Sequence, residues 1–273
     1  MNDRVLFAGP YIGEFGHEVL GTGLLRAHAR HFGRVIVCSR PSSAALYYDI
    51  ATDFRSHNIE CIGMGSRATE DTKPLTADLD ALVEPGCERW PLRFVPPNCG
   101  APKTEEQITH CRAYYHRLGT AREEWKGVVA FHARNRAHQT ERNWPMEHWE
   151  ALAKWAVDKG IAERIVCVGS REEARLVEGC IDMRGSPLGK QMDIAASARL
   201  AVGPSSGWMH LASLCGCPHL TWVGGQEHAY VKRRYLDRWN PLRTRAGVLN
   251  ARTWQPEYEQ VRNGMKKFIG GLE

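Results

Sequence analysis

The sequence of 273 residues lacks any uninterrupted apolar stretch that approaches the roughly 18–20 residues of a membrane span. The opening MNDRVLFAGPYIGEFGHE runs from a short apolar segment directly into a polar loop, a pattern that does not predict a signal peptide. These absences predict a protein that is neither secreted nor membrane-spanning. We therefore expect a cytoplasmic protein.

Patterns typical of a bound metal ion are also scarce. The one close cysteine pair, Cys215-Gly-Cys217, has no second pair at a zinc-like spacing and precedes an apparent strand. The one D-x-D pattern, Asp78-Leu-Asp80, follows no clear apolar strand and lies in a proline-rich region, so we interpret it as solvent-facing. No metal site is predicted, and we expect a reaction that needs no metal.

The nine cysteines form an odd, scattered set, and several lie inside apolar runs such as RIVCVG. We interpret them as reduced thiols that pack in the core of a cytoplasmic protein. They are Cys38, Cys61, Cys87, Cys99, Cys111, Cys167, Cys180, Cys215 and Cys217.

The composition is that of a globular protein, with 43% hydrophobic and 25% charged residues. The length fits one large α/β domain or two small domains of roughly 100–150 residues each. The net charge is +5, and the segment VKRRYLDRWNPLRTR concentrates positive charge near residues 231–245. A basic cluster favours a polyanionic partner.

The first half of the chain alternates strand-like and helix-like patterns, which predicts a parallel sheet. Proline and glycine then interrupt residues 66–103, which we interpret as an irregular insertion or linker. Thr104-Glu-Glu-Gln107 fits a capping box that opens a helix. The expected strands are Arg4–Ala8, Arg34–Ser39 and one near Cys61–Met64, and the expected helices are 18–32, 41–56 and 104–119.

The alternation restarts at Lys126, which predicts a second doubly wound sheet. We expect an N-terminal domain of residues 1–122, a second domain of residues 123–253, and a C-terminal helix in 254–273 that packs back across the halves. The expected strands are Val128–Phe131, Arg164–Val168, Leu200–Gly203 and His219–Val223, and the expected helices are 146–159, Ser170–Cys180, Ser206–Cys215 and 255–269.

Two loops at the carboxyl ends of expected strands carry suitable chemistry for a phosphate group. Gly203-Pro-Ser-Ser-Gly-Trp-Met-His210 offers two hydroxyls and a glycine at a helix start, which suits a diphosphate, although the same pattern can simply cap a helix. The loop from His132 to Trp144 holds three arginines and two histidines. Arginine clamps phosphate oxygens with paired N–H groups, and the alternative is an exposed basic loop.

Taken in order, these segments resemble the donor half of the heptosyltransferase-like glycosyltransferases. The resemblance covers about residues 126–226 and rests on W-P-x-x-x-W, a strand that ends V-G-S, R-G-S-P-L-G-K, and A-V-G-P-S-S-G-W-M-H-L-A-S-L. It implies an α/β fold of the GT-B type, with two facing Rossmann-like doubly wound parallel-sheet domains. It also implies a nucleotide-diphosphate sugar as donor substrate, with no cofactor and no divalent metal required.

The resemblance assigns the sugar donor to loops of the C-terminal half. Ser205 stands where the family usually has aspartate and Trp208 where it has proline, so we expect the sugar or its recognition to differ from a heptose. The implied sugar-donor residues are Arg134 and Arg142 near the phosphates, Gly169 and Ser170 by the nucleoside, and Ser205, Ser206, Gly207, Met209 and His210 along the diphosphate and sugar.

The N-terminal segment from Gly9 to Glu18 resembles the first loop of the same family, in which an acidic residue is proposed to act as the base. Glu14 matches that position, His17 and Glu18 are fallback candidates, and the alternative is that Glu14 merely caps the following helix. The P-Y-x-G-E-F-G-x-E pattern, with the later R-W-N-P-L, also resembles glycosyltransferases predicted in bacteriophage genomes.

These features together predict an inverting glycosyltransferase with Glu14 or His17 in catalysis. As acceptor we expect a hydroxymethylated pyrimidine in phage DNA, flipped out of the duplex, with Tyr11, Lys232, Arg233 and Arg234 as acceptor or phosphate contacts. A saccharide or lipopolysaccharide acceptor is the first alternative. An inactive nucleotide-sugar-binding protein is the second, because Ser205 departs from the family pattern.

Overall fold

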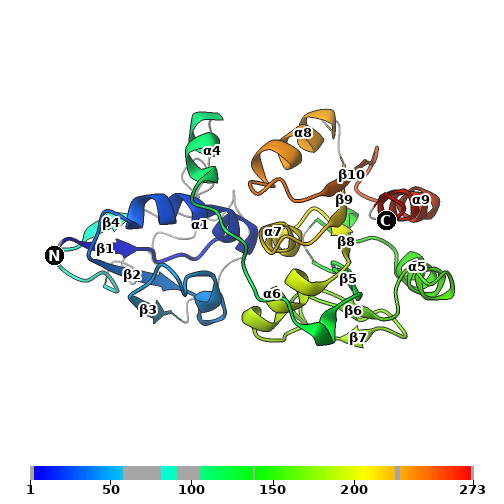
Figure 1. The fold of residues 1–273 in the computed structure, drawn as a ribbon, viewed down its shortest axis with the longest axis horizontal. Coiled ribbons are helices and arrows are strands. Elements are labelled where there is room, and N and C mark those ends of the chain that lie inside the picture. Colours follow the sequence, from blue (N-terminus) through cyan, green and yellow to red (C-terminus); the bar gives the residue numbers. More distant parts are fainter. Residues whose placement is uncertain (1–2, 58–80, 91–104, 138, 225–227, 272–273) are drawn as a thin grey trace. The chain divides into compact units, whose positions relative to one another are not determined.

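The computed structural model describes residues 3–57, 81–90, 105–137, 139–224 and 228–271. The chain divides into two compact units, Met1–Tyr115 and His116–Glu273, so the division falls shortly before the expected boundary at 122/123. Each unit contains one parallel sheet with helices around it (Figure 1). The α/β class expected from the alternating pattern is confirmed.

The first unit is built on a four-stranded sheet with the order β3-β2-β1-β4. The helix α1 (Phe15–Ala29) connects β1 to β2, as expected, and β2 has the predicted bounds. Phe7, Ile36 and Cys38 form a buried cluster on one face, against Leu82 and Val83. The strands are β1 Val5–Ala8, β2 Arg34–Ser39, β3 Asp53–Ser56 and β4 Glu88–Trp90.

The prediction of a helix over 41–56 was wrong. The segment begins as a short 3-10 helix, Pro41–Leu46, and ends as strand β3. The reason is the docking of Thr52 on β2: its N–H donates to the carbonyl of Val35 at 2.9 Å, and its Oγ1 accepts from the N–H of Val35 at 2.9 Å. These bonds place the next residues in register with β2.

The stretch 66–103, expected to be irregular, contributes strand β4, which pairs in parallel with β1. The strand expected near Cys61–Met64 and the D-x-D pattern Asp78–Asp80 lie outside the described residues. So does Thr104, on which the predicted capping box depends. The helix that follows, α4 (Glu105–Arg112), is shorter than the expected 104–119.

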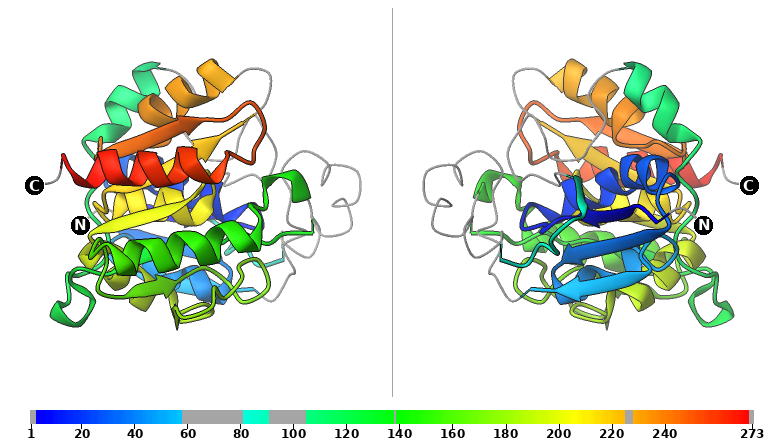
Figure 2. Two further views of the ribbon diagram at one scale, coloured as in Figure 1. Left: turned by 90° about the vertical axis from the view of Figure 1, so that its right-hand side faces the viewer. Right: turned by 90° about the vertical axis from the view of Figure 1, so that its left-hand side faces the viewer.

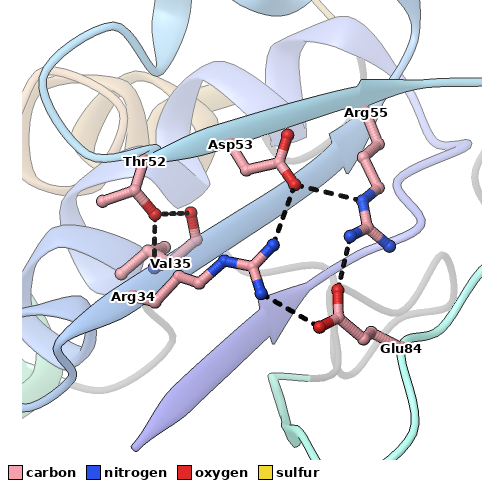
Figure 3. A network of polar contacts seen from close by, with 6 residues as sticks. All are labelled: Arg34, Val35, Thr52, Asp53, Arg55 and Glu84. Carbon is pink, nitrogen blue, oxygen red and sulfur yellow. Dashed lines mark hydrogen bonds and ion pairs between the residues drawn. The ribbon is translucent and has the colours of Figure 1, made fainter. Parts of the chain in front are cut away.

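A network of charged side chains links the outer strands of this sheet (Figure 3). Arg34 donates to Glu84 at 2.9 Å and to Asp53 at 3.4 Å, and Arg55 contacts the same two carboxylates. Because all four side chains are partly exposed, we expect each pair to contribute little to the free energy of folding. The network still ties β2, β3 and the segment before β4 together.

The second unit holds a six-stranded parallel sheet with the order β10-β9-β8-β5-β6-β7. Helices α5 and α9 cover one face, and α6, α7 and α8 cover the other (Figure 1). Its strands are β5 Val129–Phe131, β6 Ile165–Cys167, β7 Ile181–Asp182, β8 Leu200–Pro204, β9 His219–Val223 and β10 Ala246–Asn250. Its helices are α5 Met146–Asp158, α6 Leu188–Ser197, α7 Gly207–Leu214, α8 His228–Arg238 and α9 Tyr258–Ile269.

The core of this unit lies between the sheet and the pair α5 and α9, which run side by side (Figure 2, left). Trp149 of α5 and Met265 of α9 pack with Phe131 and Trp222 of the sheet in one buried cluster. Helix α9 thus packs on α5, β9 and β10 and belongs to the second unit. We had expected it to pack across both halves.

The prediction of a helix from Ser170 to Cys180 was wrong. Ser170-Arg-Glu-Glu173 fits a capping box, and half of it forms, since the Ser170 Oγ accepts from the N–H of Glu173 at 3.1 Å. The backbone then pairs with the loop after β5 instead: the N–H of Asn135 donates to the carbonyl of Glu173 at 2.7 Å, and the N–H of Arg175 to that of Ala133 at 2.8 Å. Four elements, α6, α8, β7 and β10, were not predicted.

Cys215 and Cys217 are buried free thiols, in line with the packing interpretation. In the described part of the chain, no three His, Cys, Asp or Glu side chains gather in a group that could hold a metal ion. Within the same residues, no helix combines the length and the apolar character that a membrane crossing requires.

Candidate functional site

Both sheets reverse their strand order at one point. In the second sheet the chain passes from β5 outward through β6 and β7 and then returns to β8, on the other side of β5. In the first sheet it passes from β1 through β2 and β3, and β4 lies on the other side of β1. Ligands of open α/β sheets bind at such reversals, at the carboxyl ends of the strands. The loops after β1, β5 and β8 are therefore the candidate sites.

The loops after β5 and β8 meet through His132 and Ser206. The His132 Nδ1 atom lies 3.1 Å from the Ser206 Oγ atom. Ser206 is the N-cap of α7, and its Oγ accepts from the N–H of Met209 at 3.5 Å. The first turn of α7, which begins at Gly207, thus lies at the strand reversal, where its N–H groups favour an anion.

Arg142 lies directly beside this helix start. Its guanidinium donates to the carbonyl of Ser205 and, at 2.8 Å, to the side-chain oxygen of Gln139. The guanidinium carbon is also 4.1 Å from the ring centroid of Trp254. These contacts hold a positive charge at the residue that precedes the N-cap of α7.

Arg134 and Arg136 belong to the same loop but have different surroundings. Arg134 is buried, and it donates to the carbonyl of Gln139 at 3.0 Å and to the side chain of Asn143. Arg136 pairs with Glu173, with 3.0 Å between Nε and Oε1. Arg134 therefore stabilises the loop from inside through hydrogen bonds. Because it is buried, it acts on a ligand through its charge and not through direct contact.

The site is electropositive. Burial and, after it, the charges of Arg134, Arg136 and Arg142 lower the pKa of His132 to about 3, so the imidazole is neutral near pH 7. Burial together with the charges of Arg142 and Arg136 lowers the pKa of Arg134 to about 10, and the nearby glutamates offset this only in part. An anion bound here would relieve that repulsion.

Gln191 connects three of the loops and was missed from the sequence. Its Oε1 accepts from the N–H of Gly169 at 3.0 Å and from the indole N–H of Trp208 at 3.0 Å, and its Nε2 donates to the carbonyl of Ser186 at 2.9 Å. The Trp208 ring stacks parallel to the His132 imidazole, with 6.0 Å between centroids. Trp208 therefore serves the packing behind the site.

Gly169 also packs closely against His132. Its φ of +108° is a conformation that favours glycine, and a Cβ there would lie 2.9 Å from the His132 ring. Position 169, predicted to lie by the nucleoside, thus requires glycine because a larger side chain would collide with the His132 ring. Ser170, its neighbour, is exposed.

The loop after β1 carries Glu14 at the N-cap of α1. The Glu14 side chain makes no capping hydrogen bond, although its charge still lies at the positive end of the helix. Its Oε2 lies 3.7 Å from His17 Nε2, and both side chains are about one-third exposed. Glu18 is buried and accepts hydrogen bonds from Ser43 at 2.8 Å and from Tyr47 at 2.9 Å, which places it inside the fold.

Comparison with known proteins decides the family. The model of glycosyltransferase family 9 (heptosyltransferase) matches residues 92–266, which is more than half of the chain. The chain belongs to glycosyltransferase family 9. No curated protein sequence shows a significant match.

Solved structures agree with the family 9 assignment. The E. coli ADP-heptose lps heptosyltransferase II matches with a TM-score of 0.61 at 13% identity, covering 98% of this chain and 99% of that one. The E. coli heptosyltransferase WaaC with ADP gives 0.60 at 14% identity, covering 99% and 100%. A family 9 protein from Veillonella parvula gives 0.59 at 12% identity, covering 98% and 97%. These matches show the fold, which is GT-B, and confirm the predicted resemblance.

Two residues expected to line the sugar donor in this family 9 chain have buried side chains. Met209 is fully buried, and the His210 ring packs at 5.5 Å from the rings of both Tyr235 and Trp239. The His210 side chain therefore packs α7 against Tyr235 of α8.

The expected acceptor contacts also have partners within the fold. Tyr11 is buried, and its hydroxyl donates to the carbonyl of Glu14 at 2.7 Å. On α8, Arg233 lies 3.4 Å from Asp237, and Arg234 lies over the ring of Trp239. Lys232 precedes them on the same helix and is partly exposed.

Proposed function

We propose that the chain transfers a sugar from a nucleotide-diphosphate sugar to an acceptor hydroxyl, with inversion and without a divalent metal. The observation that carries this proposal is that the basic loop after β5 meets the start of α7. Arg142 of that loop donates to the carbonyl of Ser205, and its His132 Nδ1 lies 3.1 Å from the Ser206 Oγ. A diphosphate is the part of a nucleotide sugar that compensates such a charge.

The diphosphate binds the first turn of α7 and the guanidinium of Arg142. The N–H groups of Gly207 and Trp208 belong to the turn whose amides have no partner within the helix, and such amides bind phosphate oxygens. Arg142 adds charge beside them. Gly169 and Ser170 lie next to this loop and take the nucleoside. The WaaC structure, which resembles this fold, contains ADP, and this supports a nucleotide as the ligand.

The chemistry requires a base and a stabilised leaving group. Glu14 takes the proton of the acceptor hydroxyl as the oxygen attacks the anomeric carbon, and the bond from that carbon to the diphosphate oxygen breaks. One displacement inverts the configuration at that carbon. The α7 amides and the arginines stabilise the negative charge that develops on the diphosphate. They supply the positive charge that a metal provides in other glycosyltransferases.

As acceptor we propose a saccharide hydroxyl. The matched E. coli heptosyltransferase II is named for a lipopolysaccharide (lps), and this likeness favours a saccharide. The DNA acceptor expected from the basic cluster gains no support from the comparisons. Asp237, which pairs with Arg233 on α8, also offsets part of the positive charge that a phosphate backbone would meet.

A thermal-shift screen of nucleoside diphosphates and their sugars tests the sugar-donor site. A ligand at 100 times its dissociation constant adds roughly 2.7 kcal/mol of stability, which gives a readable shift in Tm. Release of nucleoside diphosphate from the nucleotide sugar that binds, in the presence of oligosaccharides and of duplex DNA, then identifies the acceptor. Binding without release for any acceptor would favour the inactive alternative, and the absence of any nucleotide shift would overturn the proposal.

A further inference from the structure

Helix α1 carries a buried carboxylate one turn after the proposed base. Glu18 accepts hydrogen bonds from the hydroxyls of Ser43 at 2.8 Å, Tyr47 at 2.9 Å and Ser39. These three donors all lie in the segment from the end of β2 through the 3-10 helix. Burial raises the pKa of Glu18, and the hydroxyls together with Arg40 oppose that rise.

Arg40 joins this carboxylate to the loop after β1. Its Nε lies 3.4 Å from Glu18 Oε2, and its Nη2 donates to the carbonyl of Gly13, the residue immediately before Glu14. The Arg40 side chain also lies over the ring of Tyr11, 5.9 Å from the centroid. A single guanidinium thus connects a buried charge on α1 to the peptide that carries Glu14.

Tyr11 holds the other side of the same loop. Its N–H donates to the carbonyl of Cys38 at 2.9 Å, and its carbonyl lies 2.8 Å from His57 Nε2. Its hydroxyl donates to the carbonyl of Glu14 at 2.7 Å, and that carbonyl in turn accepts from the N–H groups of His17 and Glu18. The backbone of Glu14 is therefore fixed from both directions by residues that follow β2 and β3.

We propose that Arg40 and Glu18 are positioning residues that fix the Glu14 loop for catalysis. The inference rests on the proposed role of Glu14 as base. A carboxylate that must reach an acceptor hydroxyl gains from a backbone held in one place, because a misplacement of about 1 Å is costly in rate. Glu18, a fallback candidate for the base, acts instead through Arg40.

The same helix offers a matched control for a purely structural role. Arg26 is buried on α1 and pairs with Asp49 at 2.9 Å, and it donates to the carbonyl of Leu46 at 3.2 Å. This ion pair also joins α1 to the segment after β2, but its contacts lie at the far end of that segment from the Glu14 loop. Arg26→Met therefore removes a comparable buried pair without touching Gly13.

Hydrogen–deuterium exchange on the full chain tests the positioning role without any ligand. In Arg40→Met we expect the N–H groups of Tyr11, His17 and Glu18 to exchange about 5- to 10-fold faster, while the rest of α1 keeps its rates. Arg26→Met should leave these three amides unchanged. Arg40→Lys keeps a positive charge near Glu18 and should restore part of the protection, which also covers the case in which Arg40→Met folds poorly.

Turnover separates this inference from the proposed function. Using the nucleotide sugar identified by the thermal-shift screen, we expect Arg40→Met to lower kcat about 10-fold or more with nucleotide binding unchanged. Unchanged exchange in the loop, or equal acceleration along α1 in Arg40→Met and Arg26→Met, would overturn the positioning role. Loss of loop protection with a normal kcat, in a protein that Glu14→Gln inactivates, would also overturn it. A Glu14→Gln variant that keeps its activity would instead show that Glu14 is not the base. The exchange rates would still report whether Arg40 holds the loop.

Discussion

The Nδ1 atom of His132 lies 3.1 Å from the Oγ atom of Ser206, so the loop after β5 and the N-cap of α7 contact each other where the strand order of the second sheet reverses. Ser206 accepts from an α7 amide at the same time. This pair fixes the helix start relative to the arginine loop.

Ser206→Ala removes the N-cap of α7 and the contact with His132. Loss of a serine cap costs about 1 kcal/mol of protein stability, and we expect a lower Tm together with weaker nucleoside-diphosphate binding. Calorimetry and thermal unfolding measure the two effects. Ser197→Ala is the control, because the Ser197 Oγ also accepts from a backbone N–H, that of Arg122 at 2.7 Å, but lies at the end of α6 and caps no helix start. Equal nucleotide affinity in Ser206→Ala and the wild type would count against the site.

Acid should destabilise the protein partly through His132. Its pKa is lowered from 6.5 to about 3 in the folded state, so between these values the unfolded chain binds the extra proton. The free energy of unfolding then falls by about 1.4 kcal/mol for each pH unit below 6.5. Urea unfolding between pH 7 and 4 should show a smaller decline for His132→Asn. The decline due to His219, whose pKa is lowered to about 4, should remain in that variant.

Identical pH slopes in His132→Asn and the wild type would mean that the pKa of His132 is the same in the folded and in the unfolded chain. Such a result would contradict the lowered pKa of His132 in the folded protein.

Glu14→Gln keeps the size of the side chain and removes proton acceptance. We expect kcat to fall roughly 100- to 10,000-fold while nucleotide-sugar binding stays intact. Steady-state kinetics and calorimetry on the same preparation test this expectation. Near-normal turnover in Glu14→Gln together with loss of activity in His17→Gln would move the base to His17, whose Nε2 lies 3.7 Å from the Glu14 carboxylate.

Transfer should not depend on a divalent metal. The arginine loop and the α7 amides supply the positive charge at the proposed diphosphate site, so EDTA should leave the rate nearly unchanged. The assay needs a sample previously dialysed against chelator and a parallel sample with added Mg²⁺ or Mn²⁺. A rate that collapses with EDTA and returns with either ion would contradict this part of the proposal.

The parts of the fold that local sequence encodes were predicted well. The strands Arg34–Ser39 and His219–Val223 are continuous apolar runs, and both have the expected bounds. Helix α7 begins after Ser206, as its N-cap pattern indicated. The arginine loop and the N-terminal loop with Glu14 were also recognised, because both follow apolar strands directly.

The errors arose where contacts distant in sequence outweigh local preference. The capping pattern at Ser170 is real, but the backbone at Glu173 and Arg175 pairs with the loop after β5 instead of forming a helix. Gln191 resembles an ordinary surface glutamine, and only the meeting of Gly169, Ser186 and Trp208 around it reveals its role. No local signal marks such a residue.

The central claim is that a diphosphate binds at the start of α7 beside Arg142, and calorimetric titration tests it most directly. The ligands are the nucleoside, its monophosphate and its diphosphate, each titrated into the wild type and into Arg142→Gln. Arg164→Gln is the control, because Arg164 lies at the opposite, amino-terminal end of β6. We predict that Arg142→Gln weakens diphosphate binding about 10- to 100-fold, leaves nucleoside binding unchanged, and differs in this from Arg164→Gln. Equal diphosphate affinity in Arg142→Gln and the wild type would contradict the account.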